Sequence, residues 1–426
     1  MSIQRQRFLE NEYEHQPVPI GSRKPLWSVS LIWAGFPLVI TGALVGGSIV
    51  DALGFRTGLL AMLVGNLILF AYVGIQSAIA AKSGMSFALI ATRVFGVKGY
   101  RLTSGLLATV VIGWFAVQTG ITGSTLHSSW GITPLWLDIL AGLIFMGITI
   151  VGVKALSIIG AVSVPFFLVM GGLALKIALD HSSWPLILHF SGHFASTLTF
   201  GGAVTMVIAL FIDSGTMTPD FTRWAKSPKD AVIATFWAFP LANFLSMFFG
   251  AVVSAAGTES QGNFASVIVH LGPWGTLMAA AFLFVNSGSV CSHCLYNAAT
   301  GFSQILGRKL RWMALILGLV GTWAAAMGMG SLLATWLSFL AVIVPGIGGS
   351  IMGHFLVFKK ARVSLPGIAF TSWILGGLAS LSVQLTSVPF PAAVTGMLTA
   401  FGAYLVLAFL RTRIRSMGPD RIVEEE

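Results

Sequence analysis

Apolar runs of about 20 residues recur along this 426-residue chain, and they constrain its fold more than any other feature. A helix of that length spans the ~30 Å hydrocarbon core of a bilayer. Hydrophobic residues make up 56% of the chain and charged residues only 9%. The runs are continuous, whereas a transmembrane β-barrel needs short alternating segments. The sequence therefore predicts an all-α polytopic membrane protein.

The apolar runs divide into twelve predicted spans. They are Trp27–Val50, Gly58–Ala80, Leu102–Leu126, Leu135–Val153, Leu156–Leu179, Ser196–Thr218, Ala231–Ala256, Gly275–Gly301, Trp312–Met329, Leu332–Leu356, Gly367–Leu385 and Ala392–Leu410. The linker Lys82–Arg101 is semi-apolar and predicts an interfacial helix. The apolar piece Phe264–Leu271, between spans seven and eight, would suit an outer gate.

Lysine and arginine set the expected orientation, because cytoplasmic loops of membrane proteins are enriched in both. With the N-terminus in the cytoplasm, all but Arg56 and Lys176 of the 24 basic residues fall on the inner side. We therefore expect both termini in the cytoplasm and the chain in the cell (inner) membrane. The net charge of +10 reflects this topology and predicts no nucleic-acid partner. The polar start, Met1–Pro25, lacks the apolar core of a cleavable signal.

Two spans are interrupted by helix-breaking residues. Gly35–Phe36–Pro37 and Gly42 interrupt span one, and the stretch Ala209–Asp220 interrupts span six. Broken backbone at membrane depth persists only where protein buries it or it lines a cavity. Breaks five spans apart suggest two five-helix halves of inverted topology around a shared site. The expected organisation is an N-terminal segment (1–26), a ten-helix core (27–356), two accessory helices (357–410) and a cytoplasmic tail (411–426).

Asp213 is the leading candidate functional residue, because it lies in the interrupted part of span six. A charged side chain at that depth costs at least ~2.5 kcal/mol on insertion scales, so it indicates a site. Asp213 would either hydrogen-bond an amino group or protonated ring nitrogen of a substrate, or carry a coupling proton. The structural alternative is that Asp213 or Ser214 caps the half-helix after the break.

Span three carries Trp114 and Gln118 four residues apart, and therefore on one helix face. An indole offers a stacking surface and an amide reads a polar edge, as a planar heteroaromatic ligand requires. Leu210 and Phe211, which precede Asp213, are expected to complete this binding site, with Phe211 as a second stacking face. The alternative for Trp114 is ordinary packing within the membrane.

Span eight offers two further groups of polar residues. Asn286 and Ser289 carry oxygens suited to a hard cation such as Na⁺, although small polar residues also promote close helix packing. Cys291, His293 and Cys294 have the spacing of metal ligands, but a zinc site needs four and no partner pair is evident. No metal site, catalytic residue or cofactor is therefore expected, and the cysteines are more simply buried small residues.

Several local sequences, in order and on the expected spans, resemble one known family. They are Pro17–Val18–Pro19, Gly46–Gly47, Phe95–Gly96–Val97–Lys98–Gly99, Gly113–Trp114–Phe115, Gly215–Thr216–Met217–Thr218–Pro219–Asp220–Phe221 with Arg223, and Leu295–Tyr296. Through them nearly the whole chain resembles the nucleobase:cation symporter-1 family, and within it the bacterial cytosine permeases.

The resemblance implies a LeuT-like fold of twelve helices, with a five-plus-five inverted repeat and discontinuous helices one and six. It implies a secondary active importer of a nucleobase or related heterocycle, coupled to Na⁺ or H⁺ and working by alternating access. A cytosine-like amino-pyrimidine is favoured. The protein would be no enzyme, would lie in the lipid bilayer and would act as a monomer.

The resemblance also implies roles for individual residues. The heterocycle would stack between Trp114 and Phe211. Sodium would be held by carbonyls of the Gly35–Leu38 region, by Asn286 and by Ser289.

Three positions depart from the pattern of the family. Gln118 matches members that carry hydantoins, whereas cytosine permeases have a glutamine where this chain has Val111. They also have a serine where this chain has Asp213. Val290 replaces a second hydroxyl ligand of the sodium site, so proton coupling through Asp213 competes with sodium coupling, and His293 is a remote second proton carrier.

Three other functions stay open at this point. An amine or amino-acid carrier of the same fold would use Asp213 as a counter-ion. A membrane enzyme with a His/Cys metal site is a remote alternative, and a passive channel is a third.

Overall fold

The computed structural model describes residue 13 and residues 16–193, 197–258, 261–358, 364–386 and 388–417. Apart from one bridge between Lys24 and Ala225, the regular structure of these residues is helical. Residues 1–12, the tail beyond 417 and Ser196, where span six was expected to begin, lie outside the described residues.

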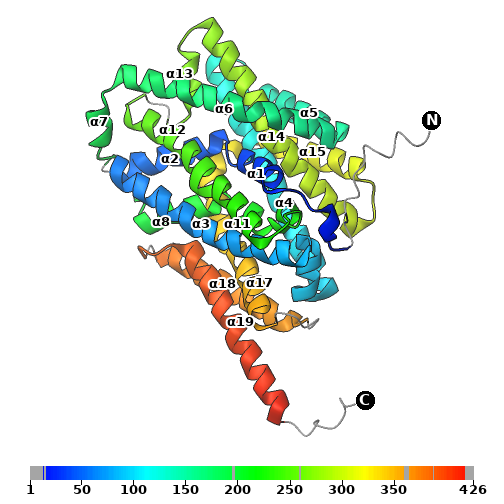
Figure 1. Ribbon diagram of the computed structural model, residues 1–426. Helices are drawn as coiled ribbons and strands as arrows, with labels where there is room; N and C mark the ends of the chain where they lie inside the picture. The colour runs from blue at the N-terminus through cyan, green and yellow to red at the C-terminus, as the bar shows by residue number, and fades with distance from the viewer. Residues whose placement is uncertain are drawn as a thin grey trace, which may run out of the picture.

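The helices follow one another in the order shown by colour and label in Figure 1. They are α1 (Leu26–Gly35), α2 (Ile40–Leu53), α3 (Phe55–Ser83), α4 (Phe87–Trp130), α5 (Pro134–Val151), α6 (Val153–His181), α7 (Trp184–Leu188), α8 (Phe200–Ala209), α9 (Ile212–Thr216), α10 (Pro219–Thr222), α11 (Pro228–Phe236), α12 (Phe244–Ala255), α13 (Phe264–Val269), α14 (Pro273–Leu306), α15 (Leu310–Ala326), α16 (Leu333–Ile343), α17 (Pro345–Val357), α18 (Pro366–Thr386) and α19 (Ala392–Met417). Short 3₁₀ turns lie at Ile20–Ser22 and Met329–Leu332, and a π-helical turn at Trp237–Asn243.

The twelve predicted spans are confirmed. Among the described residues, nine helical segments are long and apolar enough to cross a membrane. The other three spans contain the shorter apolar helices α2, α8 and α15, and α2 and α8 belong to the interrupted spans one and six. The chain is therefore a multi-pass membrane protein.

Both predicted interruptions are present. In span one, α1 ends at Gly35 and α2 begins at Ile40. In span six, α8 ends at Ala209 and α9 begins at Ile212. Gly42 was expected to contribute to the first break, but it lies within α2. Its missing side chain instead leaves room for Ser246 of α12, whose hydroxyl donates to the Val39 carbonyl at 2.7 Å.

The structure adds two interruptions that were not predicted. Span ten divides into α16 and α17 at Val344–Pro345, and span seven contains the π-helical turn around Pro240. Proline removes a backbone donor and its ring clashes with the preceding turn, which explains both positions. The predicted linker helix is present as the first part of α4, set off by Gly96 with φ of +74°. The apolar piece before span eight forms α13.

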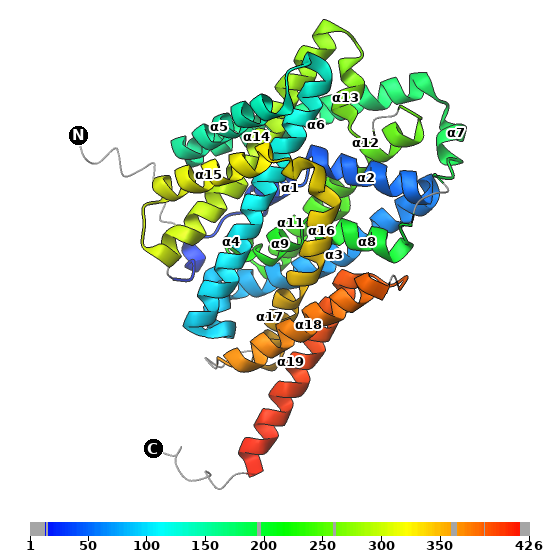
Figure 2. The ribbon, with the colours of Figure 1, turned by 180° about the vertical axis from the view of Figure 1, so that it is seen from behind.

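Helices from distant parts of the chain surround the two breaks. α4 packs along α5 and α14 on one side, while α2 packs against α12 on the other. Figures 1 and 2 show the last two helices, α18 and α19, beneath the rest of the bundle, with α19 extending away from it. The breaks consequently face α4 and α14 inside the bundle, which makes a site possible there.

Candidate functional site

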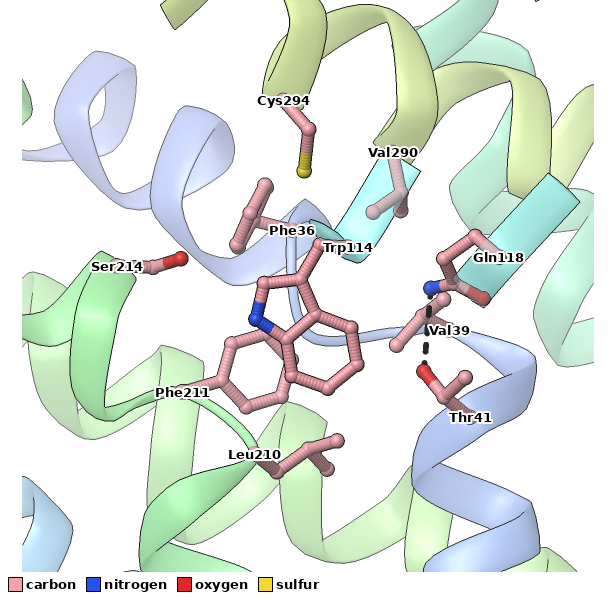
Figure 3. A pocket seen from close by; sticks show the side chains of 10 residues that line it. All are labelled: Phe36, Val39, Thr41, Trp114, Gln118, Leu210, Phe211, Ser214, Val290 and Cys294. Atoms are coloured by element: carbon pink, nitrogen blue, oxygen red, sulfur yellow. Dashed lines mark hydrogen bonds between the residues drawn. The ribbon is translucent and has the colours of Figure 1, made fainter. Parts of the chain in front are cut away.

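A small pocket lies where the two broken spans meet α4 and α14 (Figure 3). Its lining residues are Phe36, Val39, Thr41, Trp114, Gln118, Leu210, Phe211, Ser214, Val290 and Cys294. The structure thus brings together four predicted site residues, Trp114 and Gln118 from α4 with Leu210 and Phe211 from the second break. The cavity holds only about 10 Å³, room for roughly one water. A heterocycle would therefore have to displace the walls.

Aromatic side chains dominate the walls of the pocket. Trp114 and Phe211 are 5% and 4% exposed, and the Phe211 ring lies behind the indole in Figure 3. The rings of Phe36 and Phe211 meet edge to face, with centroids 5.7 Å apart. Flat apolar faces of this kind favour a planar ligand over a flexible one. Phe36, from the break in span one, is an aromatic wall that the sequence did not single out.

Gln118 is fixed by one hydrogen bond and offers another. Its Nε2 donates to Thr41 Oγ1 on α2 at 3.1 Å, while its Oε1 has no partner in the described structure. The side chain is 1% exposed. A buried acceptor without a donor costs free energy of about 1–3 kcal/mol. Gln118 is therefore ready to accept a hydrogen bond from a ligand N–H group.

Asp213 does not line this pocket, and its neighbour Ser214 does. Asp213 is fully buried, and the Ser214 hydroxyl donates to its Oδ1 at a long 3.4 Å. Its Oδ2 has no hydrogen-bond partner, and among the described residues Asp213 forms no salt bridge. Phe211 occupies the N-cap position of α9 without a side-chain cap bond, and Asp213 lies in the first turn of the same helix, so the capping alternative for Asp213 stays open. The carboxyl lies one residue behind the pocket wall.

A hydrogen bond joins two of the four predicted ion-binding residues, Leu38 and Asn286. Asn286 Nδ2 donates to the Leu38 carbonyl at 2.8 Å and to Ser163 Oγ at 3.1 Å, and its Oδ1 accepts from Ile40 N–H at 3.1 Å. Asn286 thereby ties the break in span one to α14 and α6. Ser163 was not predicted.

The other two predicted ion ligands have their own surroundings. The Ser289 carbonyl lies 2.7 Å from His293 Nδ1, and the Ser289 side chain is 8% exposed. Gly35 packs against Val164, since a Cβ placed on Gly35 would lie 3.0 Å from a Val164 methyl carbon. Only Leu38 and Asn286 of the four are seen in direct contact.

Six pocket residues were missed as site residues by sequence reasoning: Phe36, Val39, Thr41, Ser214, Val290 and Cys294. Phe36, Val39 and Thr41 flank the first break, so the break itself was a usable signal. Cys294 was considered only as a metal ligand. Among the described residues, no group of three or more His, Cys, Asp and Glu could hold a metal ion.

Comparison with known proteins identifies the kind of protein. The family model described as permease for cytosine/purines, uracil, thiamine, allantoin matches residues 17–407. The cytosine permease of Escherichia coli (strain K12) is 29% identical over 351 residues, which cover 82% of each chain.

Solved structures of Mhp1, a nucleobase-cation-symport-1 family transporter, have the same fold. Its closed form with bromovinylhydantoin bound is 19% identical, covers 95% of this chain and 96% of its own, and gives a TM-score of 0.73. The inward-facing form is 17% identical, covers 95% of both chains and gives 0.78. The expected LeuT-like fold is thereby confirmed. This chain belongs to the permease family for cytosine/purines, uracil, thiamine and allantoin, within the nucleobase:cation symporter-1 group, and is a transporter rather than an enzyme.

Proposed function

We propose that the protein imports a cytosine-like amino-pyrimidine by cation-coupled symport, and that the substrate binds between Trp114 and Phe211. The observation that carries the proposal is the pocket itself, which joins two aromatic faces to the unpaired Oε1 of Gln118. Base–aromatic stacking contributes about 1–3 kcal/mol for each base. The likeness to a cytosine permease supports the choice of substrate.

The hydrogen-bonding groups of the pocket suit an amino-pyrimidine. Oε1 of Gln118 would accept from an exocyclic amine or ring N–H, and the Ser214 hydroxyl could donate to a ring carbonyl or nitrogen. No lysine, arginine, aspartate or glutamate is among the lining residues, so the bound form of the substrate is expected to be neutral. This arrangement favours a nucleobase over an amino acid, which would bring two charges into the pocket.

We propose H⁺ as the coupling ion, with Asp213 as its carrier. The two predicted oxygen ligands already accept hydrogen bonds, the Leu38 carbonyl from Asn286 Nδ2 and Asn286 Oδ1 from Ile40 N–H, and Val290 supplies no hydroxyl, so few ligands remain for Na⁺. The titratable side chains that interact with Asp213 are Tyr72 of α3 and Cys294 of α14. Protonation would neutralise a carboxyl that is buried without a salt bridge, and coupling requires that the two access states differ in their affinity for this proton.

The transport cycle would rock the broken spans against the other helices. The Gln118–Thr41 hydrogen bond joins α4 to α2 beside the pocket, and Asn263 Nδ2 donates to Thr125 Oγ1 at 2.8 Å next to α13. We propose that these contacts close the outer side. The protein would act as a monomer in the inner membrane with both termini cytoplasmic, with a ten-helix core at 27–356 and accessory helices at 357–410.

The first test is the melting temperature of the purified protein with cytosine, uracil, adenine, a hydantoin and several amines. Each ligand would be measured in Na⁺ and in choline buffer at two pH values. A ligand that binds only the folded state raises the melting temperature. We expect cytosine to raise it without Na⁺ and with dependence on pH. A response to amines but not to any base would overturn the assignment and favour an amine carrier with Asp213 as counter-ion.

The coupling proposal has its own variant. Asp213→Asn removes the titrating group and keeps the size of the side chain, so cytosine binding should persist while its dependence on pH is lost. Asp51→Asn is the matched control, because Asp51 lies outside the pocket at the end of α2. Proton coupling through Asp213 would be wrong if the variant kept the pH dependence of the parent protein, or if Na⁺ restored accumulation in it.

A further inference from the structure

The α14 wall of the pocket consists of two side chains one helical turn apart, Val290 and Cys294. They are 8% and 3% exposed, and the Cys294 sulfur points into the pocket in Figure 3. Neither side chain demands a strong hydrogen bond, since valine has no polar atom and a thiol is a weak donor and weak acceptor. The α14 side of the pocket is therefore largely apolar and makes no strong hydrogen bond to a ligand.

The walls formed by α4 and by the second break are more polar than the α14 wall. Gln118 on α4 keeps an unpaired Oε1 although the side chain is 99% buried, being only 1% exposed. Ser214, from the second break, makes only a long hydrogen bond to Asp213 within its own helix. A buried acceptor without a partner costs free energy, which a ligand that donates to it would remove. A planar ligand with polar and carbon edges would therefore place its polar edges away from α14.

We propose that Cys294 is a specificity-determining residue, and that it faces the carbon edge of the bound heterocycle and limits the size of the substituent there. This inference rests on the proposed function. For an amino-pyrimidine, the carbon edge is C5–C6, since the other ring positions carry nitrogen, oxygen or the amine. Trp114 and Gln118 then select a pyrimidine ring, while Cys294 decides whether a substituent at C5 of that ring is accepted.

The size of the effect follows from the chemistry of small pockets. One additional methyl group in a tight apolar pocket changes binding by about 10–200-fold. Cys294→Ala removes one sulfur atom, which is close to the volume of a methyl group, and so makes room for a 5-methyl substituent. Cys294→Leu adds bulk on the same wall and should exclude even the unsubstituted base.

The experiment compares cytosine and 5-methylcytosine as competitors of labelled cytosine uptake by the full-length protein. Cys291→Ala is the matched control, because Cys291 is buried on the same helix but does not line the pocket. We expect Cys294→Ala to shift the inhibition ratio about tenfold toward 5-methylcytosine, and Cys291→Ala to leave it unchanged. An unchanged ratio in Cys294→Ala, in a protein that still transports cytosine, would overturn the inference and leave the proposed function intact.

A second readout does not depend on the choice of analogue. Cys291 and Cys294 are the only cysteines in the chain. A thiol adds across the carbon–carbon double bond of N-ethylmaleimide. The sulfur bonds to one of the two carbons, and the thiol proton is transferred to the other. In Cys291→Ala, alkylation of Cys294 should stop uptake, and saturating cytosine should slow the alkylation. Alkylation that bound cytosine does not slow would place Cys294 outside the site, whereas failure of any pyrimidine to bind would defeat the proposed function as well.

Discussion

Trp114 is the residue on which the account of binding depends most. It forms one face of the pocket, and the only role we assign to it is stacking. We expect Trp114→Ala to weaken cytosine binding by about 1–3 kcal/mol, roughly 5- to 150-fold in dissociation constant, and Trp114→Phe to weaken it less. Titration calorimetry of the purified variants measures this directly. The control is Trp323→Ala on α15, whose side chain is 67% exposed; equal losses in both variants would point to destabilisation instead.

Asn286 carries a prediction about stability, because it satisfies backbone groups of the first break. In Asn286→Ala, the Leu38 carbonyl and the Ile40 N–H lose their partners, each at a cost of about 1–3 kcal/mol. We expect a clear fall in melting temperature. Gln384→Ala is the control, since its amide donates to the Ser338 carbonyl at an exposed position. An unchanged melting temperature in Asn286→Ala would mean that water replaces the amide and that the break does not depend on it.

Residues of the site were predictable where the signal is local. Trp114 and Gln118 share a helix face by their spacing, and Phe211 adjoins a visible break. Cys294 was considered only as a metal ligand, because the sequence of α14 does not reveal which of its faces meets α4. The bond from Asn286 to Leu38 joins residues 248 positions apart, and the family resemblance, not a local sequence signal, brought these two residues together.

At the scale of elements, the close approach of α2 and α12 depends on glycine. A Cβ on Gly46 would fall on the Met247 backbone carbonyl, and one on Gly250 would fall on the Ala43 carbonyl. At these two contacts the backbones of α2 and α12 touch directly, which small residues commonly allow in membrane proteins. α2 is the second half of span one, so its position against α12 also fixes one side of the pocket.

The corresponding prediction is that Gly46→Ala destabilises the protein by about 1–3 kcal/mol through overpacking, with reduced transport. The measurement is the melting temperature together with initial uptake rates. Gly147→Ala in α5 is the matched control, because no atom lies within 4 Å of its added Cβ. That change should be neutral or slightly stabilising, and a neutral Gly46→Ala would contradict the packing account.

The breaks of spans one and six were predicted because glycine, proline and a charge interrupt apolar runs that should otherwise be helical. Pro345 and Pro240 carried a comparable signal in spans ten and seven, but proline is tolerated in membrane helices when neighbouring groups satisfy the backbone. Whether a proline divides a span or only produces a π turn depends on its packing partners. Local sequence could therefore locate the residues but not the outcome.

At the scale of the whole molecule, the helical class and the number of spans were accessible from the sequence because the bilayer fixes span length and satisfies no backbone group. Twelve spans follow from that constraint alone. The size of the cavity does not, because it depends on how far the broken spans have closed on α4. At about 10 Å³ the pocket is too small for a heterocycle to enter without movement of its walls.

The central claim is concentrative transport of an amino-pyrimidine through the Trp114 pocket. The most direct measurement is uptake of labelled cytosine into proteoliposomes with an imposed inward proton gradient, with and without Na⁺, for the parent protein and Trp114→Ala. The account predicts saturable accumulation above equilibrium that a protonophore abolishes, that does not need Na⁺ and that is lost in the variant. Cytosine that only equilibrates across the membrane, or accumulation that Trp114→Ala leaves unchanged, would contradict it.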